Sequence, residues 1–325
     1  PLPSHYWKSR DITATTLKPQ PSSGAYKVAA VDPGRSITYE RVSDYWGEGL
    51  PVNVGQNNIQ TIRYDYYRDF GVMFEAFKAG DLDFRSESSS KRWATEYDFP
   101  AIKDGRVLRA EPRSERPEGM QGLVLNTRRA KFSDSRVREA LAMLFDFEWT
   151  QKALLYGQYT RTESYFPNSD YGSSGPLAED EKAILEPYRS QLPETVFENG
   201  FKVSRTDGSG RIRRELRRAL KLLKVAGWSL KEGKLRDSKG QQMTVEILLV
   251  QPDFERLLSP YIDNLKRAGI AASMRIVDTS QYENRTNDFD FDMVNVKFNF
   301  FPPPGPELRS HYGSKASTKI GSANW

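Results

Sequence analysis

The sequence contains no cysteine, and only two of its 325 residues are histidine. The missing cysteines exclude disulfide bonds and thiolate zinc sites, and they suit an exported protein that meets oxidising conditions. His5 and His311 stand near opposite ends of the chain. A histidine metal cluster or a dispersed catalytic triad would need more histidines, so we interpret both as ordinary surface residues.

Long apolar runs and enzyme signatures are also missing. No stretch of about 18 apolar residues occurs, which is the length that a membrane-spanning helix needs. The motifs G-x-S-x-G, H-E-x-x-H, the Walker loop and G-x-G-x-x-G do not occur either. The chain starts at Pro1 without a signal segment, so we expect that an upstream part has been removed. These absences favour a protein that is not an enzyme and has no cofactor or resident metal.

The charge is modest but unevenly distributed. Lysine and arginine number 48 against 43 acidic residues, and residues 211–218 hold five arginines. Such a run is compatible with nucleic-acid binding. However, Leu216, Leu220 and Leu223 recur at helical spacing there, which favours an amphipathic helix with its arginines in solvent. We therefore expect no nucleic-acid partner.

Hydrophobic periodicity predicts helices that alternate with strands, which is typical of an α/β sheet with covering helices. We expect strands at residues 25–31, 36–41, 61–67, 122–126, 244–250, 272–277 and 292–296. Helices are expected at residues 68–79, 91–97, 134–152, 179–185, 212–226, 253–268 and 280–287. Asp69 and Gly80 are the expected cap and stop of the first helix. Residues 297–325 are rich in proline and glycine and are predicted to be irregular.

Three aspartates alternate with phenylalanines near the end of this pattern. In a strand, Asp288, Asp290 and Asp292 would point the same way, as a calcium ion or an acid–base pair requires. The alternative is a strand entry in which Phe289 and Phe291 are buried and the carboxylates face water. The second interpretation is preferred because no compensating ligands lie nearby in the sequence.

A series of segments, in order along nearly the whole chain, resembles the family 5 extracellular solute-binding proteins of peptide and nickel ABC importers. These segments are residues 23–28, 39–41, 44–46, 74–84, 125–127, 132–134 and 136–141. Within that family the YejA-like oligopeptide-binding group is the most similar. The segments that carry this second resemblance are residues 92–100, 119–122, 156–159, 278–285 and 289–293.

The resemblance implies an α/β fold of the periplasmic binding protein-like II type, cluster C, with mixed sheets and covering helices. Two lobes would be joined by a hinge, and lobe I would be incomplete in this chain. Residues 1–63 would form a β-rich part of lobe I, residues 64–292 lobe II, and residues 293–325 a return segment to lobe I.

The resemblance also implies a function. The chain would belong to the periplasmic, monomeric substrate-binding component of an ABC importer, which closes its lobes on a ligand and delivers it to an inner-membrane permease. The ligand would be an oligopeptide or a peptide-like conjugate, such as a cell-wall peptide or a microcin C-type compound. Two alternatives stay open: a binding protein for nickel or another metal chelate, and a hydrolytic enzyme that uses Asp288, Asp290 and Asp292.

In relatives, the segment that follows the last crossing strand lies along the ligand backbone, and residues 297–301 occupy that place here. Arginines offer a planar fork for carboxylates, and aromatic rings offer flat packing faces. The candidate ligand-binding residues are Arg85, Trp93, Tyr97, Gln121, Asn126, Tyr282, Arg285, Asn295, Lys297, Phe298, Asn299, Phe300 and Phe301.

Some of these residues have structural alternatives. Trp93 and Tyr97 are one helical turn apart, which is also compatible with a place in the core. Arg285 could instead form a surface ion pair with Glu283 or Asp288, and Asn126 could cap the end of a strand.

The segment 297–301 lacks the aspartate with which many relatives pair the ammonium group of a peptide. The first acid after Asp292 is Glu307. This departure favours a modified, blocked or anionic peptide.

Overall fold

The structure, a computed structural model, describes residues 3–12, 14, 16–112, 116–173, 175–198, 200, 202–300 and 303–324. The chain forms two compact units, which comprise residues 1–86 with 99–104, and residues 87–98 with 105–325. These units are not the predicted lobes. The lobe boundaries expected at residues 63 and 293 stay a prediction. Among the described residues, no helix combines the length and apolarity that a bilayer span requires.

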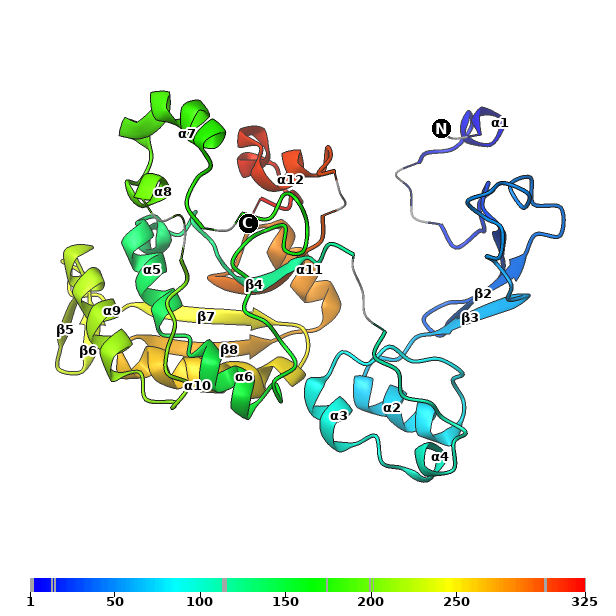
Figure 1. Ribbon diagram of the computed structural model, residues 1–325, viewed down its shortest axis with the longest axis horizontal. Helices are drawn as coiled ribbons and strands as arrows, with labels where there is room; N and C mark the ends of the chain where they lie inside the picture. The colour runs from blue at the N-terminus through cyan, green and yellow to red at the C-terminus, as the bar shows by residue number, and fades with distance from the viewer. Residues whose placement is uncertain are drawn as a thin grey trace. The chain divides into compact units, whose positions relative to one another are not determined.

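The first unit contains a three-stranded antiparallel sheet and short helices (Figure 1). Gly34, at a φ of 75°, allows the tight turn between the first two strands. The carboxylate of Asp69 accepts a hydrogen bond from the N–H of Val72 and caps α2, which ends at Gly80 as predicted. The elements are α1 (Ser4–Trp7), β1 (Tyr26–Asp32), β2 (Ser36–Arg41), β3 (Thr61–Asp65), α2 (Phe70–Ala79) and α4 (Pro100–Lys103).

The second unit is built on a mixed four-stranded sheet in the order β4-β9-β7-β8. Strand β9 pairs antiparallel with β4 and parallel with β7, and β7 pairs parallel with β8. A separate hairpin consists of β5 and β6. The strands are β4 (Met120–Leu125), β5 (Ser229–Lys231), β6 (Lys234–Arg236), β7 (Thr244–Leu249), β8 (Ala271–Ile276) and β9 (Met293–Phe298).

Helices cover both faces of this sheet. The longest are α9 and α10, which pack with α5 against one face. The helices of the second unit are α3 (Ser90–Thr95), η1 (Ala130–Phe132), α5 (Ser135–Met143), α6 (Phe147–Ala153), α7 (Glu179–Leu185), η2 (Glu186–Gln191), α8 (Thr195–Glu198), α9 (Arg213–Val225), α10 (Asp253–Arg267), α11 (Thr279–Asn287), α12 (Leu308–Tyr312) and η3 (Ser314–Thr318).

Alternation along β7 and β9 separates two apolar clusters, one on each face of the sheet. Val245, Ile247 and Met293 belong to the cluster that contains α5, α9 and α10. Leu248 and Val294 are their neighbours along the strands and belong to the other cluster. Successive strand residues point to opposite faces, so both central strands are apolar on both sides. Each fully buried side chain of this size contributes roughly 1.5–3 kcal/mol.

The predicted elements are confirmed to within two residues at each end, with one exception. The single helix expected over residues 134–152 is wrong, because α5 ends at Met143 and α6 begins at Phe147. The carboxylate of Asp146 accepts a hydrogen bond from the N–H of Trp149 at 3.1 Å, and the hydroxyl of Thr206 donates to the same carboxylate. A buried capping aspartate therefore starts a second helix inside the apolar pattern.

The expectation of an irregular tail is also corrected, because residues 297–325 contain the end of β9, α12 and η3. Leu308 packs against the cluster around Val294 and Phe298, which gives α12 an apolar anchor. The β5–β6 hairpin was not predicted. The solvent-facing arginines of residues 211–218 are confirmed, since α9 buries Ala219 and Leu223 on its opposite side.

Replacing Asp146 with alanine should lower the free energy of unfolding by about 2–3 kcal/mol, because the α6 cap and one of the two carboxylate contacts of the Thr206 hydroxyl are lost together. Asp278 caps α11 from an exposed position by accepting from the N–H of Gln281. The control variant D278A should therefore cost only about 1 kcal/mol. Urea denaturation followed by circular dichroism measures both, and equal losses would contradict the role of the Thr206 contact.

Candidate functional site

Most of the candidate residues lie on or directly after β9. Gln121 of β4 is directly opposite Lys297 of β9, and Gln121 donates to Oδ1 of Asn295 at 3.5 Å. By strand alternation these three side chains share one face of the sheet. Lys297 and Asn299 are exposed. This end of the β4–β9 pair therefore presents amide groups and one positive charge.

Aromatic side chains gather on the opposite face at the same strand end. Phe298 and Phe300 are buried, and their rings stack with centroids 6.3 Å apart and an interplanar angle of 11°. Phe166 lies 4.9 Å from Phe300. The ring of His311 lies 5.6 Å from that of Phe298 and 5.4 Å from that of Phe300. Phe301 lies outside the described residues.

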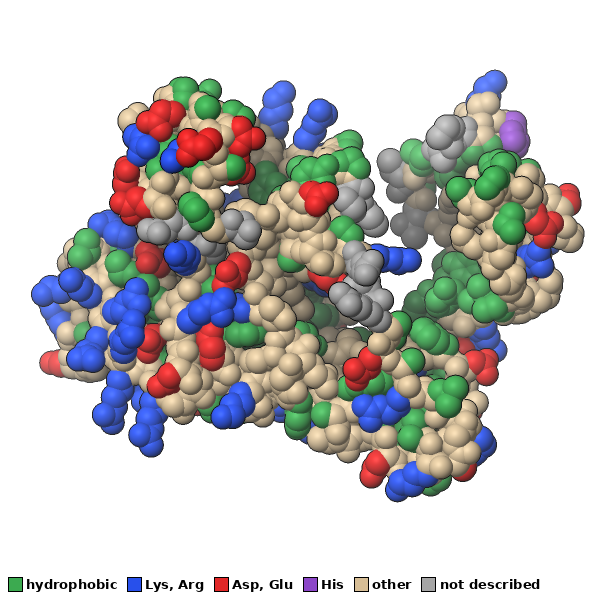
Figure 2. Space-filling view, in the orientation of Figure 1, with side chains coloured by type: hydrophobic (Ala, Val, Ile, Leu, Met, Phe, Trp, Pro, Cys, Tyr) green, Lys and Arg blue, Asp and Glu red, His purple; other side chains and the backbone are tan. Residues whose placement is uncertain are grey.

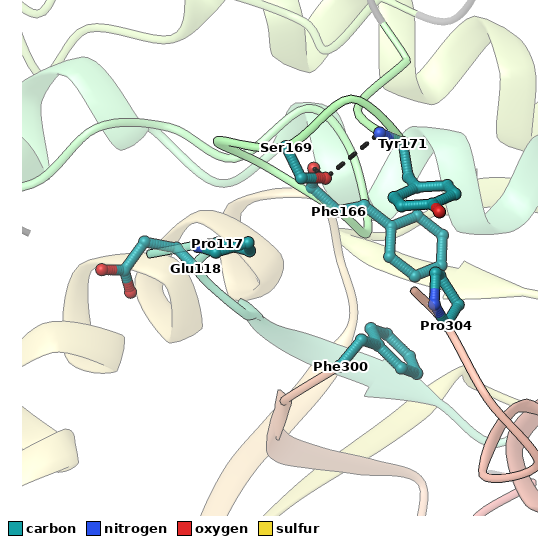
Figure 3. A pocket seen from close by; sticks show the side chains of 7 residues that line it. All are labelled: Pro117, Glu118, Phe166, Ser169, Tyr171, Phe300 and Pro304. Carbon is teal, nitrogen blue, oxygen red and sulfur yellow. Dashed lines mark hydrogen bonds between the residues drawn. The ribbon is translucent and has the colours of Figure 1, made fainter. Parts of the chain in front are cut away.

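A shallow pocket opens beside Phe300 (Figure 3). It is a surface depression: of its empty volume of about 210 Å³, the enclosed part has room for about one water molecule and the rest is open to solvent. Rings and prolines form its walls, and Glu118 also lines it, but the Glu118 carboxylate points away from the rings (Figure 3). The lining residues are Pro117, Glu118, Phe166, Ser169, Tyr171, Phe300 and Pro304. The ring faces at its surface can pack against part of a flat or apolar group.

Gly119 holds the segment after β9 close to β4. A β-carbon added at Gly119 would lie 2.1 Å from the carbonyl oxygen of Phe298 and 2.6 Å from Oδ1 of Asn299. Any larger residue at this position would push residues 298 and 299 away. The glycine therefore helps to position the segment that carries Phe298, Asn299 and Phe300.

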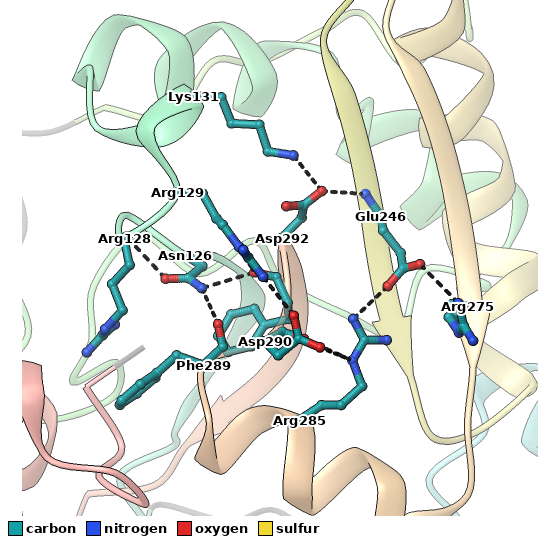
Figure 4. Close-up of polar contacts among 11 residues, drawn as sticks. Asn126, Arg128, Arg129, Lys131, Glu246, Arg275, Arg285, Phe289, Asp290 and Asp292 are labelled. Atoms are coloured by element: carbon teal, nitrogen blue, oxygen red, sulfur yellow. Dashed lines mark hydrogen bonds and ion pairs between the residues drawn. The ribbon is translucent and has the colours of Figure 1, made fainter.

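Asn126 braces the other end of the β4–β9 pair (Figure 4). Its side chain is 0% exposed, and Nδ2 donates to the carbonyl oxygens of Phe289 at 2.8 Å and Phe291 at 3.0 Å. Its Oδ1 accepts from the N–H of Arg128 at 3.1 Å. Both donor hydrogens are engaged within the protein, as in the strand-end interpretation. A ligand contact of Asn126 stays a prediction.

Arg285 takes part in an ion-pair network beside Asn126. It contacts Glu246 at 2.9 Å and Asp290 at 3.2 Å, instead of the expected Glu283 or Asp288. Asp292 pairs with Lys131 at 2.7 Å and accepts from the N–H of Glu246 at 3.0 Å. The network joins α11, β7 and the start of β9, so Arg285 has a structural role in addition to any contact with ligand.

Tyr282 extends from α11 to the middle of β9. Its hydroxyl donates to the carbonyl oxygen of Asn295 at 3.2 Å. Burial, and to a smaller extent the charge of Glu283, raise the pKa of Tyr282 to about 12. The phenol therefore stays protonated and keeps this hydrogen bond at neutral pH.

Asp288, Asp290 and Asp292 do not lie side by side on one face of a strand. The catalytic alternative required that arrangement. Strand β9 begins at Met293, and Phe289 has a φ of 56°, which is the left-handed region. Asp290 and Asp292 are engaged with basic side chains. Within the described ranges, no group of three or more His, Cys, Asp or Glu side chains is placed to hold a metal ion.

Trp93 and Tyr97 form a second aromatic group in the same unit. Their ring centroids are 5.1 Å apart, and the guanidinium of Arg109 lies 4.1 Å from the centre of the Trp93 ring. The indole N–H of Trp93 donates to Glu111, and the hydroxyl of Tyr97 donates to Glu87. Tyr97 is buried and Trp93 half-buried, so their roles as ligand contacts stay predictions.

Arg85 belongs to the first unit. Its guanidinium lies 5.3 Å from the ring centre of Phe74 on α2. A ligand contact of Arg85 stays a prediction.

Sequence reasoning did not find Glu118, Phe166, Tyr171 or His311 as parts of the site. Phe166 and Tyr171 lie in the long segment between α6 and α7, where no periodicity indicates a direction for a side chain. Glu118 precedes β4 by only two residues, and strand alternation from Met120 would have placed it on the face of Phe298.

Comparison with known proteins identifies the family. The model for bacterial extracellular solute-binding proteins, family 5 Middle, matches residues 1–319. The chain belongs to this family. Family 5 membership confirms the resemblance on which the predicted fold was based.

Curated relatives match the whole chain. It is 44% identical over 333 residues to the probable peptide-binding protein YejA of Agrobacterium fabrum, covering 99% of this chain and 54% of that protein. It is 36% identical over 332 residues to the peptidoglycan-binding protein YepA of the same organism, covering 100% of this chain and 54% of that protein. The chain thus spans about half the length of the curated relatives it matches.

Solved structures confirm the predicted α/β fold of family 5 binding proteins. The oligopeptide-binding protein AppA of Bacillus subtilis, in complex with a nonapeptide, matches with a TM-score of 0.64 and 18% identity over 91% of this chain and 50% of that one. NikZ of Campylobacter jejuni, in complex with Ni(L-His), matches with a TM-score of 0.61 and 15% identity over 95% of this chain and 52% of that one.

Replacing Asn126 with alanine should lower the free energy of unfolding by about 2–4 kcal/mol, because the carbonyl of Phe289 loses its side-chain donor and that of Phe291 keeps only the long contact from Arg129. The exposed Asn299 offers a matched control, and N299A should change stability by less than about 0.5 kcal/mol. Hydrogen exchange should also accelerate at the amides of residues 291–294 in N126A alone. Unchanged exchange there would contradict the bracing role.

Proposed function

We propose that this chain supplies part of the ligand-binding site of an ABC importer's substrate-binding protein, and that the ligand is an oligopeptide or a peptide-like conjugate. The cluster of aromatic rings at the end of β9 carries the proposal, together with the exposed Glu118 beside it and Lys297 on the other face of the same strand end. The relatives named for peptide and peptidoglycan binding support the same ligand class.

The chemistry of the strand end suits a peptide backbone with charged ends. Glu118 offers a counter-charge for an ammonium group, and Lys297 offers one for a carboxylate. Gln121 and Asn299 can donate to and accept from peptide groups. The rings of Phe300 and Tyr171 provide faces for an apolar side chain or a sugar ring.

Glu118 changes the expected ligand. The segment 297–301 has no acid of its own, which favoured a modified or blocked peptide. A carboxylate that comes from the residues before β4 can take the place of the missing aspartate. A free amino terminus is therefore compatible with this site, and a cell-wall peptide or another conjugate stays within the proposed class.

The remaining steps belong to the longer protein. We expect capture by closure of two lobes about a hinge, because family 5 members act as binding proteins for importers. Delivery to an inner-membrane permease, a periplasmic location and a monomeric state complete the proposal.

A metal chelate is the second candidate, and His311 is the observation in its favour. Its Nδ1 lies 3.0 Å from the carbonyl oxygen of Glu307, which favours the tautomer with hydrogen on Nδ1. The lone pair of Nε2 is then available beside Phe298 and Phe300. If the ligand is a nickel chelate, H311A should abolish its binding, whereas binding of a peptide should only weaken, because the ring contacts with Phe298 and Phe300 are lost.

Isothermal titration calorimetry on the full-length protein tests the peptide proposal. E118Q should weaken a peptide with a free amino terminus about tenfold, because a charged hydrogen bond to the ammonium group is lost. The same peptide with an acetylated amino terminus should bind the variant and the parent equally.

The exposed Glu283 gives the matched control, and E283Q should change neither affinity. Two outcomes would contradict the assignment of Glu118: an equal loss for both peptides, or no difference between E118Q and E283Q. Failure of every peptide to bind the parent protein would contradict the proposed ligand class itself.

A further inference from the structure

Helix α9 presents a face of exposed basic side chains that ligand binding does not use. Glu215 is the only acid of the helix, and it is buried. Among the described residues, Arg214 contacts Glu215 at 4.0 Å, and no other basic residue of the helix has an ion-pair partner. The exposed basic residues are Arg213, Arg214, Arg217, Arg218, Lys221 and Lys224.

The β5–β6 hairpin extends this face. It lies beside α9, and it exposes Lys231 and Lys234 on either side of a turn that contains one carboxylate, Glu232. Figure 2 shows lysine and arginine side chains gathered over the end of the second unit where Figure 1 places α9, β5 and β6. We call α9 and this hairpin together the basic face.

The spacing of the charges makes the basic face repulsive when it stands alone. Arg213 and Arg217, and Arg214 and Arg218, are four residues apart and are neighbours on the helix surface. Packing of the opposite side of α9 on the core holds these charges together. A negatively charged partner would relieve the repulsion along the whole length of the helix, about 20 Å.

Two apolar side chains stand among the charges. Val225 is 61% exposed at the end of α9 next to Lys224, and Leu230 is 48% exposed on β5 next to Lys231. Lysine beside an exposed aliphatic side chain suits a lipid surface, where the charge meets phosphate and the aliphatic group enters the headgroup layer.

Single-stranded nucleic acid fits the basic face less well. Residues 211–236, all of which the structure describes, expose no aromatic side chain on which a base could stack. Members of an extracellular binding-protein family also meet membrane surfaces rather than nucleic acid in their ordinary location.

We propose that the basic face is a docking surface for an anionic phospholipid bilayer. It attracts the protein electrostatically to the membrane, while the pocket beside Phe300 is left free. The two sites share no residue, so the membrane proposal is independent of the proposed ligand.

Vesicle co-sedimentation of the full-length protein tests this proposal. The parent should bind vesicles of phosphatidylcholine with about one-third phosphatidylglycerol, and hardly bind pure phosphatidylcholine. The double reversal R217E/R218E should lower binding to the anionic vesicles at least about tenfold, since each basic residue near such a surface contributes about fivefold. Binding of the parent should also fall steeply as salt is raised.

K315E/K319E is the matched control, because it makes the same change in net charge at exposed positions away from α9. It should bind anionic vesicles within about twofold of the parent. The neutral variant R217Q/R218Q should show an intermediate loss, and unchanged thermal unfolding of all variants excludes misfolding.

Equal losses in the two reversals, equal binding to both kinds of vesicle, or binding to DNA or an acidic protein without vesicle binding would each overturn the proposal. Peptide affinity, measured separately by calorimetry, should not change in R217E/R218E.

Discussion

Strand β9 is the constraint on which the second unit depends. It pairs with β4 on one side and β7 on the other, so its register fixes the sheet. Met293 enters one apolar cluster, while Val294 and Phe298 enter the other. A slip of one residue would reverse every one of these side chains. The same strand delivers Lys297 and Phe298 to the candidate site, so core packing and ligand recognition share one register.

The two ends of β9 have different tasks. At its start, Asn126 and the network of Arg285 and Asp292 satisfy the buried polar groups where the chain turns through Phe289 in the left-handed region. At its end, about 17 Å away, the strand gives way to exposed and aromatic residues. The start of β9 is held rigidly because its polar groups are hydrogen-bonded within the protein. It therefore supports the other end of the strand, which can contact a ligand.

Periodicity predicted the elements well because apolar spacing and capping residues act locally. Asp69 and Gly80 bound α2 as expected, whereas the cap at Asp146 lies inside a continuous apolar pattern, and its second contact, from Thr206, comes from sixty residues away in the sequence. The family resemblance identified residues 297–300 as a candidate site, but it did not identify the residues that pack beside them. The pocket joins this segment to Phe166 and Glu118, whose proximity follows from tertiary packing alone.

The central claim is that the end of β9 and the adjoining pocket bind a peptide-like solute within a larger binding protein. At that strand end Lys297 lies on one face of the sheet, while Glu118 and a set of ring faces lie on the other, and we propose that such a ligand contacts both. Native mass spectrometry of the full-length protein, purified from its own host under gentle conditions, tests the claim most directly. The account predicts a bound species whose fragmentation releases amino acids, with or without an attached sugar or nucleotide. A bound species that contains only a metal chelate or only carbohydrate would contradict it.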